Sequence, residues 1–222
     1  MAVAYDGEAN VTAGLNGVTS VTLSGKTTAG SNRCAIWHAG WGDDLSNITT
    51  ITYAGTGMTS AVVVDGSGIT GAIYRFLNPT TAGSDVAVSW GAAVYGACGC
   101  SSYNGVDQTT PVSGTANATN LSSTPATVNI TSATGEVVVD GCGQAYATPT
   151  VGAGQTQVFN SDGGSGFYFG LGSREAGAAT VTMSWTFSGN QGWVIVAASL
   201  KAAAEAGGAT YPGWYGQRGG WW

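Results

Sequence analysis

The sequence predicts an all-β protein, an antiparallel β-sandwich whose chain crosses between its two sheets as in a jelly roll. Three observations lead to this fold class. Apolar and polar residues alternate along many short segments, turn residues separate these segments at short intervals, and no long segment has the period of a helix. The 37 glycines among 222 residues also suit a chain with many turns.

The clearest predicted strand is "TVTMSWTF" at residues 180–187. Its apolar side chains fall on one face and its Thr and Ser side chains on the other, so we expect this list to be buried: Val181, Met183, Trp185 and Phe187. The segments 84–90, 126–131 and 165–171 alternate in the same way. Further strands are predicted at 18–25, 33–41, 49–55, 59–66, 70–77, 96–105, 135–142 and 192–200.

A dozen short strands without a helical layer must bury their faces sheet against sheet. We find no internal repeat along the sequence, and we expect one β-sandwich domain over residues 1–206. The segment 200–206 has room for two helical turns at most. Residues 207–222, "GGATYPGWYGQRGGWW", have no strand pattern, and we expect an extended, glycine-rich aromatic arm.

Composition and charge exclude several classes of function. Charged residues make up 8% of the chain, and the net charge is -6. The six basic residues are scattered singly, so no basic stripe exists to bind nucleic acid. No apolar run reaches the length of a membrane span, and the first residues lack the pattern of a secretory signal. A surface with so little charge is typical of proteins that work in an assembly.

Several segments in order resemble one known family. These are "GSNRCAIWHAGW", "ITTITYAGTGMTSA", "AIYRFLNPTTAGSDVAVSW", "GACGCSSYNGVDQTTPV", "GEVVVDGC" and "GWVIVAASLK". Together they resemble the jelly-roll-like β-sandwich domains of bacterial surface and secreted proteins and of tailed-phage particle proteins. The resemblance covers residues 15–203 and leaves the arm outside; "CGC" is unusual within it. It implies an extracellular or virion-borne sandwich without established chemistry.

The sequence offers little for catalysis. We expect the single histidine, His38, to lie in the core or at its rim rather than to act as a general base. Asp43 and Asp44 are adjacent in a predicted loop and are expected to be solvated turn caps, with a Ca²⁺ site there as the alternative. The other candidate carboxylates each precede glycine, which is typical of turns: Asp65, Asp140 and Asp162. No other metal or cofactor is expected.

The four cysteines are expected to be small buried side chains: Cys34, Cys98, Cys100 and Cys142. Cys98 and Cys100 point to the same face of a strand, from which they could reach the other two on neighbouring strands. One or two disulfides among the four therefore remain an alternative. The spacing of "CGC" is too short for a usual zinc knuckle.

The loop "SSYNGVDQTTPV" at 101–112 predicts a turn with defined chemistry. Asn104-Gly105 suits the left-handed backbone that ends a strand. Asp107 can accept hydrogen bonds from the backbone amides that follow it, and Pro111 interrupts strand pairing.

The exposed aromatic residues carry the functional hypothesis. We expect a non-enzymatic structural protein of a virus particle, a phage capsid decoration protein or a tail or fibre subunit, bound to copies of itself or to another virion protein. The arm residues expected to bind this partner are Tyr211, Trp214, Tyr215, Trp221 and Trp222. The alternative is a carbohydrate-binding adhesion module of a bacterial surface protein, with a platform for surface glycans formed by Trp37, Trp41, Tyr103, Tyr146 and the arm aromatics.

Overall fold

A computed structural model describes residues 1–6, 11–26, 28–42, 48–66, 68–146 and 148–204. These residues contain no helix, and all their regular elements are strands. The strands are β1 (Ala4–Tyr5), β2 (Val11–Lys26), β3 (Cys34–Gly42), β4 (Ile48–Tyr53), β5 (Thr56–Gly57), β6 (Thr59–Gly66), β7 (Ile69–Leu77), β8 (Ser84–Asn104), β9 (Val112–Ser123), β10 (Ala126–Thr131), β11 (Val137–Ala145), β12 (Pro149–Val151), β13 (Thr156–Ser161), β14 (Tyr168–Ala176), β15 (Thr180–Phe187) and β16 (Gln191–Leu200). The predicted all-β class is confirmed.

The described strands form three sheets, in which neighbouring strands are antiparallel. The first sheet has the order β5-β4-β8-β3-β7-β6, with β1 and β2 also paired to β8. The long strands β2 and β8 stay paired as they pass from one layer to another, so this sheet curls into a nearly closed barrel. The second sheet has the order β13-β14-β11-β16-β9, and the third has the order β10-β15-β12.

The strand pairings of the first half of the chain recur in the second half. β3 pairs with β7 and β8, as β11 pairs with β14 and β16. β6 pairs with β7 as β13 pairs with β14, and β4 pairs with β8 as β12 pairs with β15. The pairing of β2 with β8 corresponds to β9 with β16 and β10 with β15. We call β1–β8 the N-terminal unit and β9–β16 the C-terminal unit.

The registers recur as well. Gly40 faces Gly71 in the N-terminal unit, and Gly143 faces Gly170 in the C-terminal unit. β6 has a register shift between Ser60 and Val62, and β13 has one at the matching place, between Gln157 and Phe159. The expectation of one sandwich over 1–206 did not anticipate this duplication. The sequence hides the duplication because, these glycines aside, many equivalent positions of the two units hold unlike residues, such as Trp37 and Asp140.

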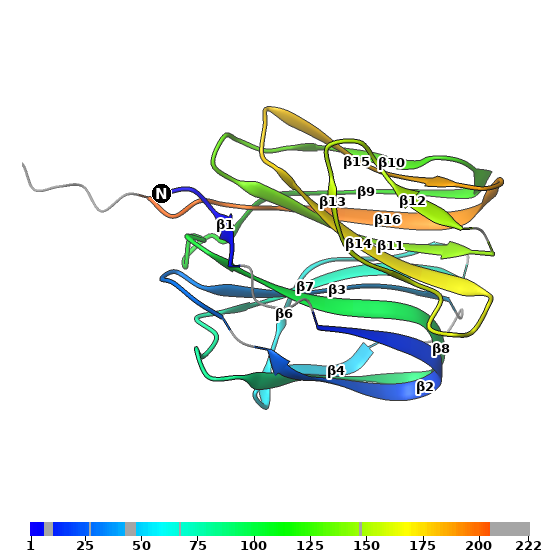
Figure 1. Ribbon diagram of the computed structural model, residues 1–222, viewed down its shortest axis with the longest axis horizontal. Helices are drawn as coiled ribbons and strands as arrows, with labels where there is room; N and C mark the ends of the chain where they lie inside the picture. Colours follow the sequence, from blue (N-terminus) through cyan, green and yellow to red (C-terminus); the bar gives the residue numbers. More distant parts are fainter. Residues whose placement is uncertain (7–10, 27, 43–47, 67, 147, 205–222) are drawn as a thin grey trace, which may run out of the picture.

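The two units stack as four layers (Figure 1). The sheet of β10, β15 and β12 covers β9, β16, β11, β14 and β13, which face β6, β7, β3 and the second half of β8. The fourth layer contains β4 with the outer halves of β2 and β8. The inner sheets of the two units therefore lie face to face at the centre of the molecule.

Each space between layers holds its own core. The N-terminal core contains Trp37, Trp41 and Trp90, whose ring centroids lie 6.0–6.4 Å apart. The C-terminal core is built around Trp185, which is fully buried. The central core, between the units, contains mainly aliphatic side chains: Ile36, Ile73, Val139, Val194 and Val196.

Glycines bring the two inner sheets close together. A Cβ atom added to Gly40 would lie 2.6 Å from the Cα of Gly143 and closer still to the carbonyl group of Cys142. Gly71 lies against Val194, and the matching residue Gly170 lies against the backbone of Ala97. Since equivalent positions make equivalent contacts, the interface between the units has approximate two-fold symmetry.

The predicted faces of the clearest strands are confirmed. In β15 the four predicted residues are at most 5% exposed, and none of the Thr and Ser residues between them is fully buried. Val86, Val88 and Trp90 in β8, and Val128 and Ile130 in β10, are buried as well. The segment 200–204 is not helical: Leu200 ends β16, and Ala202 forms an isolated bridge with Val106.

Candidate functional site

The first and the last residues that the structure describes lie at the same side of the molecule, on the left of Figure 1. Residues 201–203 are held there by the loop that follows β8. The amide of Lys201 donates to the carbonyl of Pro111 (2.9 Å), and the amide of Ala203 donates to that of Gly105 (2.8 Å). The Lys201 carbonyl accepts from the Asp107 amide (2.8 Å). The chain therefore leaves β16 along a fixed path, which we call the exit site.

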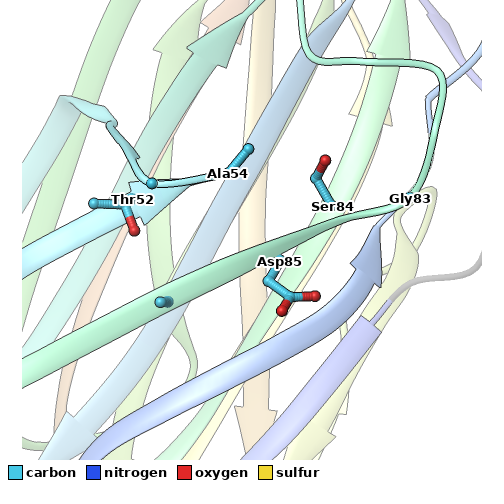
Figure 2. Close-up of a pocket in the computed structure, with 7 residues that line it drawn as sticks. Thr52, Ala54, Gly83, Ser84 and Asp85 are labelled. Carbon is cyan, nitrogen blue, oxygen red and sulfur yellow. The ribbon is translucent and has the colours of Figure 1, made fainter.

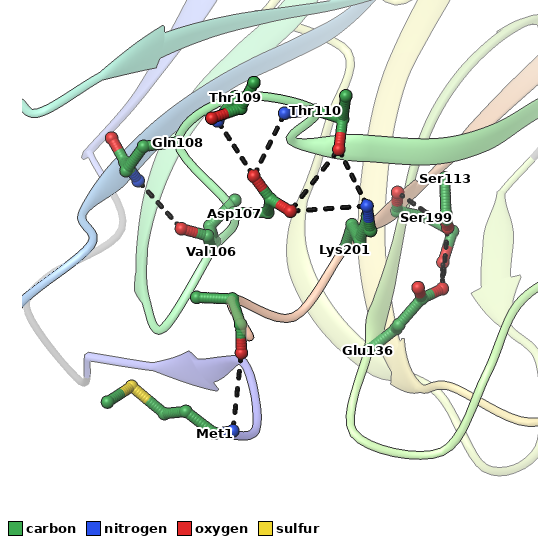
Figure 3. A network of polar contacts seen from close by, with 11 residues as sticks. Met1, Val106, Asp107, Gln108, Thr109, Thr110, Ser113, Glu136, Ser199 and Lys201 are labelled. Carbon is green, nitrogen blue, oxygen red and sulfur yellow. Dashed lines mark hydrogen bonds and ion pairs between the residues drawn. The ribbon is translucent and has the colours of Figure 1, made fainter. Parts of the chain in front are cut away.

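Asp107 organises the exit site (Figure 3). Its Oδ1 accepts hydrogen bonds from the amides of Thr109 (2.8 Å) and Thr110 (3.0 Å), and its Oδ2 lies 3.3 Å from Nζ of Lys201. The two amides, with Lys201 beside them, lower the pKa of Asp107 to about 2. Gly105 has a φ of 74°. The turn and the role predicted for Asp107 are confirmed.

A buried carboxylate adjoins the exit site. Oε2 of Glu136 accepts hydrogen bonds from the hydroxyl groups of Ser113 (2.6 Å), Ser199 (2.7 Å) and Ser132 (3.1 Å). Burial acts to raise the pKa of Glu136, but these hydrogen bonds outweigh it, and the pKa lies below its ordinary value. The cluster ties the ends of β9 and β16 to the turn before β11, directly behind the exit.

The N-terminal residues close the same end. The amide of Val3 donates to the carbonyl of Gly135 (2.7 Å), and the amino group of Met1 lies 3.4 Å from the carbonyl oxygen of Ala203. Hydrogen bonds thus join the first three residues to the turn before β11 and to residues 201–203, although these segments lie far apart in the sequence.

His38 lies in the interior of the molecule, between the two units. Its side chain is 0% exposed and packs edge-to-face on Phe159, with ring centroids 5.0 Å apart. Nδ1 donates to the backbone carbonyl of Asp140 (2.8 Å), and Nε2 lies 3.5 Å from the hydroxyl of Ser101. The histidine thus links the units through a hydrogen bond, as expected of a core histidine.

Asp140 was expected in a turn, and this expectation is wrong. The residue lies in the middle of β11, fully buried, and its carboxylate accepts hydrogen bonds from the amide of Ser173 and from Nε1 of Trp185 (2.9 Å). Burial raises the pKa of Asp140 to about 6. The position matches Trp37 of the N-terminal unit, so the same place in the fold holds a carboxyl group in one core and an indole in the other.

The aromatic platform predicted for glycans is not assembled. Trp37, Trp41 and Tyr103 are buried in the cores, at most 1% exposed. Only Tyr146 of the predicted platform in the body is on the surface, 60% exposed, in edge-to-face contact with Phe167, which is 53% exposed. The two residues lie where β11 ends and β14 begins, joined by a backbone hydrogen bond of 2.8 Å.

All four cysteines are buried free thiols. Cys98 and Cys100 lie in the N-terminal core, Cys142 in the C-terminal core and Cys34 in the central core. Burial raises the pKa of Cys34 and of Cys98 to about 12. Their distribution over three cores favours the expected role of small buried side chains over disulfide pairing.

Several predicted sites lie outside the described residues. These are the loop with Asp43 and Asp44, and the arm with Tyr211, Trp214, Tyr215, Trp221 and Trp222. Among the residues described, no three His, Cys, Asp or Glu side chains are grouped so that they could hold a metal ion. The described residues also include no helix with the length and apolar character needed to cross a membrane.

A shallow depression of about 420 Å³ lies between the β4–β5 turn and the start of β8 (Figure 2). Ser84 and Asp85 line it but point to opposite sides of their strand. The carboxylate of Asp85 accepts a hydrogen bond from the amide of Gly25 (3.2 Å). This carboxylate already serves to join β2 to β8, so the described residues that line the depression offer no free charged group.

Comparisons of the chain with known protein families, with curated proteins and with solved structures give no match. The geometry of the exit site and of the surfaces around it is therefore the basis for a function. Sequence reasoning missed the serine cluster of Glu136, because two of its three hydroxyl groups, those of Ser113 and Ser199, come from strands far away in the sequence. Only the isolated "GE" before a run of valines marked the position.

Proposed function

We propose that the chain is a non-enzymatic structural subunit of a virus particle, a phage capsid decoration protein or a tail or fibre subunit, that assembles through residues 207–222. The observation that carries the proposal is the exit site. Residues 201–203 are fixed by backbone hydrogen bonds and by the ion pair of Lys201 with Asp107, directly before the aromatic segment. A binding segment that starts from a rigid point loses less conformational freedom when it binds.

The stacked units support this role. Two sandwiches joined through close backbone contacts form a stiff body, and the low charge of the chain suits close packing against other subunits. We also propose that each unit is a variant of the jelly roll, with β2 and β8 crossing between layers in the N-terminal unit. The partner is a second copy of the chain or another virion protein, and the location is the virion.

Deletion of residues 208–222 tests the proposal. The expected product is a soluble body with an unchanged melting temperature that no longer assembles, measured by size-exclusion chromatography with light scattering and by binding to particles that lack the protein. A variant with Trp214, Trp221 and Trp222 replaced by serine should behave in the same way, because burial of large apolar side chains drives such contacts.

A matched control replaces two exposed apolar residues of the body, Leu121→Ser with Phe167→Ser. Leu121 is 69% exposed and Phe167 is 53% exposed, so this variant should assemble normally. If the deletion lowers the melting temperature at every protein concentration and leaves assembly intact, the aromatic segment covers its own body and the proposal is wrong.

A further inference from the structure

The N-terminal unit contains a pocket of about 280 Å³ that neither the exit site nor the proposed assembly uses. It opens at the edge of the unit, where β6 and β7 of the inner layer face the start of β4 at Ile48. Six residues of the inner layer line it: Trp41, Ser60, Val63, Asp65, Thr70 and Tyr74. Its volume is just below the roughly 300–1,000 Å³ of sites for drug-sized ligands, so it suits a single small ring.

Strand register places the polar groups of the pocket side by side. Ser60 pairs with Tyr74, and Asp65 pairs with Thr70, which in turn pairs with Trp41 of β3. Directly opposed residues of neighbouring strands share a face. Three hydroxyl groups, one carboxylate and one indole therefore point to the same side of the sheet, and Val63 adds an apolar wall that is 44% exposed.

One residue that lines the pocket has a buried donor without a partner. Trp41 is 1% exposed, and its Nε1, like those of Trp37 and Trp90 in the same core, is buried without a hydrogen-bond acceptor within the described part of the chain. Buried N–H groups are rarely left unpaired in folded proteins, and such exceptions are often explained by a bound water or ligand. Trp185 in the other unit has no such deficit, since it donates to Asp140.

The C-terminal unit shows the same place in a closed form. There Asn160 occupies the position equivalent to Val63 of the N-terminal unit. Its Nδ2 donates a hydrogen bond to the carbonyl of Pro149 in β12 (3.2 Å), and so links β13 to the strand equivalent to β4. Gln155 bridges the layers in the same region: its Nε2 donates to the hydroxyl of Ser173 (2.6 Å), and its Oε1 accepts from the amide of Ser184 (2.8 Å). The opening is therefore specific to the N-terminal unit and does not follow from the fold alone.

The chemistry of the lining selects the ligand. Among the described residues that line the pocket, Asp65 is the one charged group and none is basic, so anionic ligands such as phosphates are disfavoured. A carboxylate accepts strong hydrogen bonds from two neighbouring hydroxyl groups, and the hydroxyls of Ser60 and Thr70 can both donate and accept. Ile48, Val63 and the indole of Trp41 give the lining apolar groups that suit the C–H surface of a ring. We propose that this pocket binds one ring of a neutral sugar.

Indole N–H signals in ¹⁵N NMR spectra of the full chain test the proposal. Glucose, galactose, mannose and N-acetylglucosamine are each titrated to about 50 mM, because a small neutral ligand in an open site is expected to bind with a millimolar Kd. At least one sugar should shift the Trp41 signal, assigned with Trp41→Phe, in a saturable manner. Asp65→Asn should weaken this binding about tenfold or more, and Tyr74→Phe should weaken it about threefold.

The C-terminal unit supplies the matched control. Asp162 lies two residues after Asn160, as Asp65 lies two residues after Val63, but Oδ1 of Asp162 accepts a hydrogen bond from the amide of Gly164 in its own turn (2.8 Å). Asp162→Asn should therefore leave the sugar Kd unchanged. Any one of three results overturns the proposal. The Trp41 signal does not shift with any sugar, the binding is saturable but Asp65→Asn leaves it intact, or tetramethylammonium gives a stronger response than every sugar. Deletion of 208–222 should not alter sugar binding, which separates this test from that of assembly.

Discussion

Gly40→Ala tests whether close backbone contact holds the two units together. The added Cβ would lie 2.6 Å from the Cα of Gly143, whereas ordinary contact begins at 3.4 Å, so the inner sheets must part by 0.8 Å or more. The obstructing atoms belong to the backbone of β11, and no side chain can rotate away to make room. A gap of about 0.5–1 Å forfeits a quarter to a half of the dispersion attraction between facing atoms.

The expected loss is at least about 3 kcal/mol of the free energy of unfolding, the upper end of the range for overpacked cores. Denaturation in guanidinium chloride, followed by tryptophan fluorescence, measures it as a lower midpoint. Gly57→Ala is the matched control, because nothing lies within 4 Å of a Cβ at that position, and it should change stability by less than about 0.5 kcal/mol. A loss below about 1 kcal/mol for Gly40→Ala would refute the reasoning.

Three further predictions concern buried groups. Trp185→Ala should cost about 3–5 kcal/mol of unfolding free energy, and a loss below about 1 kcal/mol would contradict the burial of β15. Asp140 has a pKa raised from 3.8 to about 6, so its neutral form is favoured in the folded protein; its contribution to the free energy of unfolding should fall by about 2 kcal/mol as the pH rises from about 4 to about 6, and Asp140→Asn should remove this contribution when the two proteins are denatured at each pH. The thiols of Cys34 and Cys98, buried and with the pKa of each near 12, should react with a thiol reagent at neutral pH only after unfolding; rapid reaction of the folded protein would contradict their burial.

The sequence predicted the half-buried strands best. In β15 and β10 the period of two is complete, and both faces agree with the prediction. β9 was missed because its partly buried face consists of small residues such as Ala116 and Ala118, which carry no strong hydrophobic signal. β13 was missed because its polar residues, including Gln157 and Asn160, break the alternation.

The duplication and the candidate sites were harder to predict. Equivalent positions of the two units hold Trp37 and Asp140, or Trp41 and Gln144, so the repeat is carried by strand pairing and not by residue identity. Asp107 could be predicted because its partners are the next residues along the chain. The sugar pocket depends on which residues of β6, β7 and β3 are opposed, and only the register determines that.

The symmetric contact between the units has a consequence for how the molecule responds to dilution. A dimer of separate subunits dissociates when its concentration falls below its Kd, whereas two units on one chain remain at a fixed, high effective concentration. When both units lie on a single chain, a substitution also changes one unit without changing the other. In a homodimer any substitution appears in both subunits. Here Trp37 and Asp140 occupy equivalent places in the two units of one molecule. The N-terminal unit can therefore keep an open pocket, while side-chain hydrogen bonds close the same place in the C-terminal unit.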